Sequence, residues 1–205
     1  MSGPTYFLQG LTLGLLAAAQ PGPFQAFLLG RALKSGWRGA LPAAFAPLLS
    51  DGPIIALILL VLTQLPPLFL RAVQLGGGLF MVYLAFGVFK SWQTANFEVA
   101  EGGGDSGRNT FLQAALMNLL NPNTYIFWGL IGGPILISSW QQSPAATLSF
   151  LLGMYGTLIT GFVLLAFLFA TARQFGPKVS RGLLLVSAVA LLGLGIFQIW
   201  SGITG

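Results

Sequence analysis

One acidic side chain lies inside an apolar segment long enough to cross a membrane. Asp51 lies about twelve residues into the apolar stretch 40–65, which is about 18 Å along a helix and near the middle of a bilayer. An ionised carboxylate at that depth costs about 3 kcal/mol or more, so it should hold a proton or meet a cation or water. We interpret Asp51 as a substrate-binding and proton-coupling residue. The structural alternative is a carboxylic acid that hydrogen-bonds carbonyls freed by Pro53.

Two clusters of helix-breaking residues interrupt other apolar runs. The sequence Gln-Pro-Gly-Pro occupies 20–23, and Asn-Pro-Asn occupies 121–123. Proline lacks the backbone donor of a helix and clashes with the preceding turn, so each cluster frees polar backbone groups at membrane depth. Such backbone is tolerated where it lines a cavity, and paired broken segments in two halves of a chain are typical of transporter binding sites. The alternative is a proline kink used only for packing.

The first break offers backbone donors to an anion. The first amides of the helix that resumes after 20–23 have no partners within the helix, and its dipole end is partly positive. A substrate carboxylate at this helix end and an ammonium at Asp51 together describe a zwitterionic amino acid. Asn118, Asn121 and Tyr125 surround the second break, where they could bind substrate or join helices through amide hydrogen bonds. The predicted substrate-binding residues are Gln20, Pro21, Gly22, Pro23, Gln25, Asp51, Asn118, Asn121, Pro122 and Tyr125.

The composition points to a membrane protein. Of the 205 residues, 55% are hydrophobic and only 6% are charged, with a mean hydropathy of +0.83, whereas soluble domains carry about 25% charged residues. The chain has no Cys and no His, which excludes disulfides and removes the usual zinc, copper and haem ligands and the commonest general base. We therefore predict no enzyme activity, no catalytic residue, no metal and no cofactor. The net charge of +5 is dispersed over short loops, so no nucleic-acid partner is predicted.

Six stretches are long and apolar enough to span a bilayer. They cover approximately 6–33, 40–65, 72–92, 111–138, 145–172 and 182–200, and the second is expected to be kinked at 50–53. Eight basic residues fall in the first, third and fifth loops and one, Arg71, on the other side, which predicts a multi-pass protein with both termini outside the cytoplasm. The eight are Arg31, Lys34, Arg38, Lys90, Arg108, Arg173, Lys178 and Arg181.

Three spans in each half give the two halves opposite orientations in the membrane, which is an inverted-repeat topology. The sequence Phe-Leu-Gln-Gly at 7–10 is similar to Phe-Leu-Gln-Ala at 111–114. We predict an all-α integral membrane protein in which helices 1 and 4 are broken: residues 1–92 form the first three-helix repeat, 93–110 a cytoplasmic linker rich in glycine and acids, and 111–205 the second repeat. Glycines elsewhere in the spans, including Gly10, Gly14, Gly153 and Gly156, are assigned to close helix contacts.

These residues together resemble the LysE family of amino-acid exporters. The resemblance rests on the glycines and the Pro-Gly-Pro of span one, the Ser50-Asp51 pair, Gly87, and in the second half Phe111, Asn118 and the Asn-Pro of the second break. It implies a small secondary transporter in the bacterial inner membrane that exports amino acids or related metabolites, driven by the proton gradient. Its partners would be the lipid bilayer, an amino-acid substrate and protons.

Two departures from the family pattern bear on the substrate. Asn123 stands where many members have Lys, and Phe127 stands where the branch for basic amino acids often has an acid. A dicationic substrate would then meet Asp51 alone, so a neutral or apolar amino acid is favoured over a basic one. The alternative is a metal-ion or other small-solute permease of the same superfamily. The specific substrate, the direction of transport and the coupling ion are left open, and so is the oligomeric state, with a homodimer as one alternative.

Overall fold

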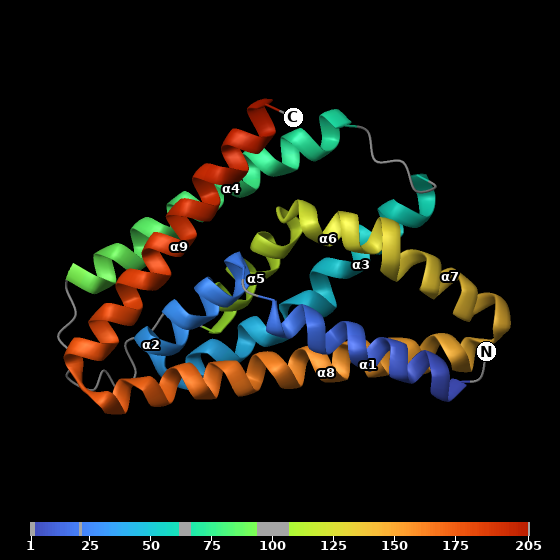
Figure 1. The fold of residues 1–205 in the computed structure, drawn as a ribbon, viewed down its shortest axis with the longest axis horizontal. Coiled ribbons are helices and arrows are strands. Elements are labelled where there is room, and N and C mark those ends of the chain that lie inside the picture. The colour runs from blue at the N-terminus through green and yellow to red at the C-terminus, as the bar shows by residue number, and fades with distance from the viewer. Residues whose placement is uncertain (1–2, 21, 62–66, 94–106, 205) are drawn as a thin grey trace.

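The computed structural model describes residues 3–20, 22–61, 67–93 and 107–204, and every element within these ranges is helical (Figure 1). The elements are α1 (Gly3–Ala19), α2 (Pro23–Ala44), α3 (Ala46–Val61), α4 (Pro67–Gln93), α5 (Gly107–Leu119), α6 (Pro122–Phe127), the π-helical turn η1 (Trp128–Gly132), α7 (Gly133–Gln142), α8 (Pro144–Thr171), the 3-10 turn η2 (Ala172–Phe175) and α9 (Pro177–Thr204). Apart from Gln93 and 107–110, the predicted linker lies outside the described residues.

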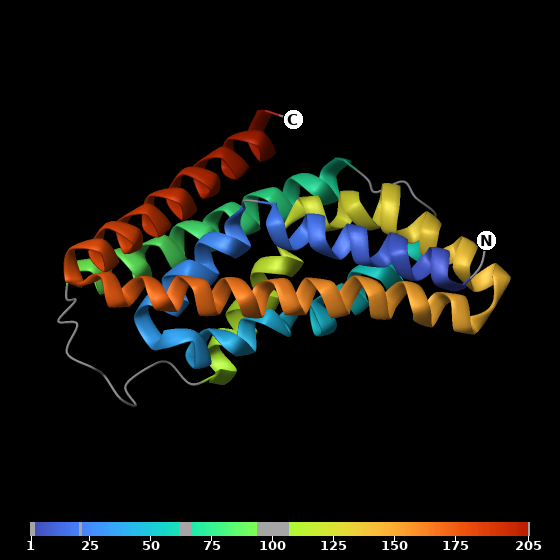
Figure 2. The ribbon, with the colours of Figure 1, turned by 60° about the horizontal axis from the view of Figure 1, so that its bottom comes forward.

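Two long helix pairs frame the bundle. Helix α1 packs along α8, and α4 packs along α9, as both views show (Figures 1 and 2). Helices α5 and α6 lie between these pairs, where α5 contacts α2 and α3. The interior of the fold is thus built around the ends of short helices rather than around continuous ones.

Both predicted helix breaks are present. Helix α1 ends at Ala19 and α2 begins at Pro23, while α5 ends at Leu119 and α6 begins at Pro122. Proline is favoured at the first position of a helix, because the amide that it lacks would have no partner there. Of the first cluster, Pro21 lies outside the described residues.

The interruption of the second span lies upstream of the kink predicted at 50–53. The chain interrupts its helix at Phe45, between α2 and α3, and α3 then continues through Asp51 and Pro53. Pro53 lies inside α3, and the amide that it lacks leaves the Leu49 carbonyl without its partner in the helix. Asp51 projects from a helix that continues through this proline.

The predicted first loop is a tight turn within α2. The direction of the chain changes at Gly36, between Lys34 and Arg38, where the φ of 71° lies in the left-handed region, which glycine enters without steric cost. Arg31, which is predicted to lie in this loop, lies on α2 before the turn and is 8% exposed. A basic side chain thus lies within the packed bundle, although it does not contact Asp51.

Glycines allow α1 and α8 to approach closely. A Cβ atom at Gly10 would come within 2.2 Å of the Phe150 carbonyl oxygen, and one at Gly14 within 2.3 Å of that of Met154. Gly153 meets α1 in the same way, which confirms the predicted packing role. Gly156 is different, since a Cβ there would meet no heavy atom within 4 Å.

The outer surface is apolar. Large side chains such as Leu60 (81% exposed) and Leu130 (70% exposed) face outward, as expected for helices that contact lipid acyl chains. Among the described residues, four segments are long and apolar enough to cross a membrane: Pro23–Leu60, Arg71–Lys90, Pro144–Thr171 and Lys178–Thr204.

The α1–α8 contact predicts opposite effects for one substitution at two positions of α8. Gly153→Ala places a methyl group 2.4 Å from the Phe7 carbonyl oxygen, and overpacking of this kind costs about 1–3 kcal/mol. Gly156→Ala meets open space and should leave stability unchanged or raise it by up to about 1 kcal/mol. Thermal unfolding in detergent measures both, and equal midpoints for the two variants would contradict the packing.

Candidate functional site

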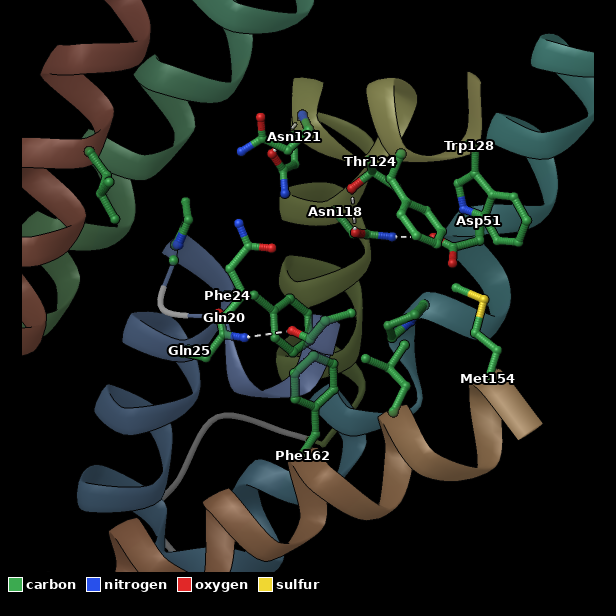
Figure 3. A pocket seen from close by; sticks show the side chains of 18 residues that line it. Gln20, Phe24, Gln25, Asp51, Asn118, Asn121, Thr124, Trp128, Met154 and Phe162 are labelled. Carbon is green, nitrogen blue, oxygen red and sulfur yellow. Dashed lines mark hydrogen bonds between the residues drawn. The ribbon is translucent and has the colours of Figure 1, made fainter. Parts of the chain in front are cut away.

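A cavity of about 240 Å³ lies between the two helix breaks (Figure 3). This is room for a small solute together with water, since one liquid water takes about 30 Å³. The wall is contributed by α1, α2, α3, α5, α6, η1, α8 and α9. The lining residues are Ala17, Gln20, Gly22, Pro23, Phe24, Gln25, Pro47, Asp51, Asn118, Asn121, Asn123, Thr124, Phe127, Trp128, Met154, Leu158, Phe162 and Leu194.

Asp51 is held by donors from two other helices. Asn118 Nδ2 of α5 lies 2.6 Å from Asp51 Oδ1, and the Tyr155 hydroxyl of α8 donates to Oδ2 at 2.9 Å. Asp51 itself is 4% exposed. Each carboxylate oxygen can accept more than one hydrogen bond, so capacity remains for a further donor from the cavity.

Asn118 connects Asp51 with the second break. Its Nδ2 also lies 2.7 Å from Ser50 Oγ, and its Oδ1 accepts a hydrogen bond of 3.0 Å from the Thr124 hydroxyl of α6. Ser50 in turn donates to the Ala46 carbonyl. A rotation of α6 against α5 would therefore disturb the donors to Asp51 directly, because one side chain serves both.

The Trp128 indole ring lies beside Asp51 (Figure 3). The ring is 1% exposed, and its Nε1–H makes no hydrogen bond with the described residues. Glycine makes room for the ring, since a Cβ at Gly132 would come within 2.7 Å of it. The π-helical turn η1 carries Trp128 at its first residue, and such turns are frequent at functional sites. The cavity thus holds a buried donor beside a buried acid.

Polar residues of the first break divide into two roles. Gln25 Nε2 donates to the carbonyls of Ala17 and Ala18, both at 3.2 Å, and so satisfies the end of α1. Gln20, Gly22 and Pro23 also line the cavity, and no side chain caps the first turn of α2.

The second break has a side-chain cap of its own. The Asn121 side chain accepts a hydrogen bond of 3.1 Å from the Asn123 amide at the start of α6, and it lines the cavity as well. Pro122 and Tyr125 are buried beside the break and are not part of the cavity wall. The Tyr125 hydroxyl donates to the Leu119 carbonyl at 2.8 Å, so its visible role is to satisfy the end of α5.

The remaining wall is apolar and aromatic. Phe24 and Phe162 stack with their ring centroids 4.5 Å apart, and Met154 and Leu158 of α8 extend the same surface. Phe127 is also part of the wall. None of the described lining residues is Lys or Arg, and no three metal-ligating side chains gather within the described residues.

Sequence reasoning missed Tyr155 and Trp128. Neither is polar enough to stand out within an apolar segment, and only their position reveals a role. Tyr155 lies as far beyond Asp51 in the sequence as Phe111 lies beyond Phe7. Under the predicted repeat, the two residues would occupy equivalent positions of spans two and five, which singles out Tyr155 but does not predict its contact with Asp51.

Comparison with known proteins identifies the family of this chain. The family model of the LysE type translocator matches residues 15–202. A protein of Bacillus subtilis (strain 168) that is named "Putative amino acid efflux protein YcgF" is 28% identical over 204 residues, which cover 96% of each chain. No solved structure matches this chain. Because the family match includes both helix breaks and Asp51, the chain belongs to the LysE type translocator family and is a membrane transporter, not an enzyme.

Proposed function

We propose that this chain exports neutral amino acids from the cytoplasm by proton antiport, around the cavity between the two helix breaks. The observation that carries the proposal is the pairing, in one small cavity, of a single carboxylate with the uncapped start of α2. Asp51 is the one acidic side chain among the described residues. Opposite charges on a zwitterion would meet complementary groups there.

Each part of an amino acid has a counterpart on the wall. The ammonium group would approach Asp51, whose oxygens retain acceptor capacity beyond Asn118 and Tyr155. The carboxylate would approach the first amides of α2, where the helix dipole favours an anion, with Gln20 beside it. The side chain would pack on the stacked rings of Phe24 and Phe162.

The charge of the wall supports a neutral substrate. A basic amino acid carries a second cation that needs a second acid or several acceptors, because an unpaired buried charge costs several kcal/mol. Phe127 offers an apolar ring at that wall instead. The name of the Bacillus subtilis relative supports amino acids as the substrate class.

Helix packing supports six spans in two inverted repeats. Helix α1 with the first part of α2 would form span one, the rest of α2 with α3 span two, α4 span three, α5 through α7 span four, α8 span five and α9 span six. Span one packs on span five through α1 and α8, and span four packs on span two through α5 and α3. The two-fold relation predicted between the halves would convert each of these two contacts into the other.

Individual residues follow the same relation. The sequence separation between Gly14 and Asn118 equals the separation between Phe7 and Phe111. The separation between Ser50 and Met154 is the same. Gly14 packs on Met154, and Asn118 hydrogen-bonds to Ser50. The two contacts are therefore equivalent in position, which supports alternating access by one repeat rocking against the other.

The distribution of basic residues supports the orientation. Arg31, Lys34 and Lys90 lie together at one cavity, and by the positive-inside rule the excess of Lys and Arg predicted in the first, third and fifth connections favours that side as the cytoplasmic one, with both termini outside. The membrane would be the bacterial inner membrane, where a proton gradient is available to drive export.

Replacing Asp51 by Asn should uncouple transport from protons. An amide cannot take up the proton that Asp51 carries, whereas it keeps the size of the side chain. Across a gradient of one pH unit, worth about 1.4 kcal/mol or tenfold, wild-type protein in vesicles should sustain up to about a tenfold amino-acid gradient, and the variant should sustain none. A proton-driven gradient in Asp51→Asn would refute the coupling role.

Removal of the Tyr155 hydroxyl should weaken substrate binding. A hydrogen bond to a charged group contributes about 1.5–3 kcal/mol, so Tyr155→Phe is expected to raise KM about tenfold or more. Tyr6→Phe is the matched control, because its buried hydroxyl contacts Ser138 away from the cavity. Equal KM values in the two variants, at equal thermal stability, would remove Tyr155 from the site.

The substrate range tests the charge argument. Inverted vesicles with the wild-type protein should take up neutral amino acids and exclude lysine and arginine. Phe127→Glu adds a second acid to the wall and should admit basic amino acids, while Phe167→Glu, on an exposed surface of α8, should not. Uptake of basic substrates alone by wild-type protein would contradict the proposal.

A further inference from the structure

A second cavity, of about 440 Å³, lies away from Asp51 and is lined by basic side chains. Helix α2 contributes Arg31 and Lys34, and α4 contributes Lys90. Gln113 of α5 and Leu184 of α9 complete the wall. Three cationic side chains at one cavity create a positive potential that favours an anion.

Regular helix spacing gathers these residues on facing stripes. On α2 the lining residues are Phe27, Gly30, Arg31 and Lys34, and on α4 they are Tyr83, Leu84, Phe86, Gly87, Val88 and Lys90. Residues three and four apart share one face of a helix, so each helix presents a continuous stripe that begins with an aromatic ring and ends with lysine. Both stripes therefore run from apolar to cationic in the same way.

Arg31 is fixed at the inner end of the cavity. Its guanidinium hydrogen-bonds to Gln113 Oε1, and its Cζ lies 5.4 Å from the centre of the Phe27 ring. The side chain is 8% exposed, whereas Lys34 and Lys90 are exposed. One buried, oriented guanidinium with two exposed ammonium groups outside it suits a phosphate, which Arg binds in a planar fork and Lys binds as a point charge.

The outer edge of the cavity faces lipid. Tyr83 is 64% exposed and Phe86 is 67% exposed, both on the outer side of α4. Trp92 stacks on Phe89 near the end of α4, with the ring centroids 5.1 Å apart, and tryptophan is enriched at the headgroup level of membranes. The cavity thus joins a cationic pocket to an apolar surface at the depth where a phospholipid has its phosphate and the start of its acyl chains.

We propose that the cavity between α2, α4, α5 and α9 binds the phosphate of an anionic phospholipid, with the acyl chains along Tyr83 and Phe86. Basic pockets between spanning helices are the form of site that holds acidic headgroups. A soluble anion would use the same cations but would gain nothing from the aromatic edge. The lipid would bridge the two repeats, since α2 and α4 belong to the first and α5 and α9 to the second.

The test compares phosphatidylglycerol with phosphatidylcholine on purified protein, by native mass spectrometry and by thermal unfolding during lipid titration. Wild-type protein should bind and be stabilised by phosphatidylglycerol preferentially. Each Lys contributes about fivefold to affinity for an anionic lipid surface, so the double variant Lys34→Gln with Lys90→Gln should bind about 25-fold more weakly. Arg38→Gln with Lys178→Gln removes the same charge from outside the cavity and should keep wild-type binding.

A second variant leaves every charge in place. A Cβ at Gly87 would meet no heavy atom within 4 Å, so Gly87→Leu should fold and occupy the cavity. It should abolish the preference for phosphatidylglycerol. Full preference in Gly87→Leu, or equal loss in the two charge variants, would refute the site. The last ligand tested is inorganic phosphate. If phosphate alone stabilised the protein as much as phosphatidylglycerol does, the site would bind a soluble anion and the lipid assignment would be wrong.

Discussion

The fold depends on how the backbone groups at the two helix breaks are satisfied. In hydrocarbon no water is available to pair a freed carbonyl, and each unpaired group costs several kcal/mol. The protein supplies side chains instead: Gln25 donates to the end of α1, Tyr125 to the Leu119 carbonyl, and Gln198 to the Leu120 carbonyl at 3.1 Å. With those carbonyls paired, the breaks can stay open toward the cavity.

The same constraint governs Asp51. A carboxylate at membrane depth needs donors, and the structure provides them from helices that do not adjoin α3 in sequence, Asn118 on α5 and Tyr155 on α8. Asn118 also contacts Thr124 beyond the second break. The acid and the break are thus parts of one hydrogen-bonded unit that joins α3, α5, α6 and α8. In the proposed mechanism, a change in the charge of Asp51 would act on all of these helices, and proton binding would shift the balance between two arrangements of the helices.

Charge is segregated between the two cavities. The described acid faces the cavity between the breaks, and Arg31 lies in the other cavity, where Gln113 accepts its hydrogen bond. If Arg31 reached Asp51, a buried ion pair would hold the acid ionised and occupied. Their separation leaves the Asp51 oxygens available to a ligand. Gln113 thereby has a role that its place in the repeated Phe-Leu-Gln sequence did not indicate.

Local chemistry in the sequence determined the membrane setting, the helical class and the positions of both breaks, because proline acts on its own backbone and apolar length is a property of composition. It also singled out most of the polar wall, including Gln20, Asp51, Asn118 and Asn121. The tertiary structure alone revealed that Tyr155 and Trp128 adjoin Asp51, that Gln25 and Tyr125 satisfy helix ends, and that the second span is interrupted at Phe45 and not at Asp51. These features depend on which helices meet and on the rotation of each about its axis, and spacing along one segment does not contain that information.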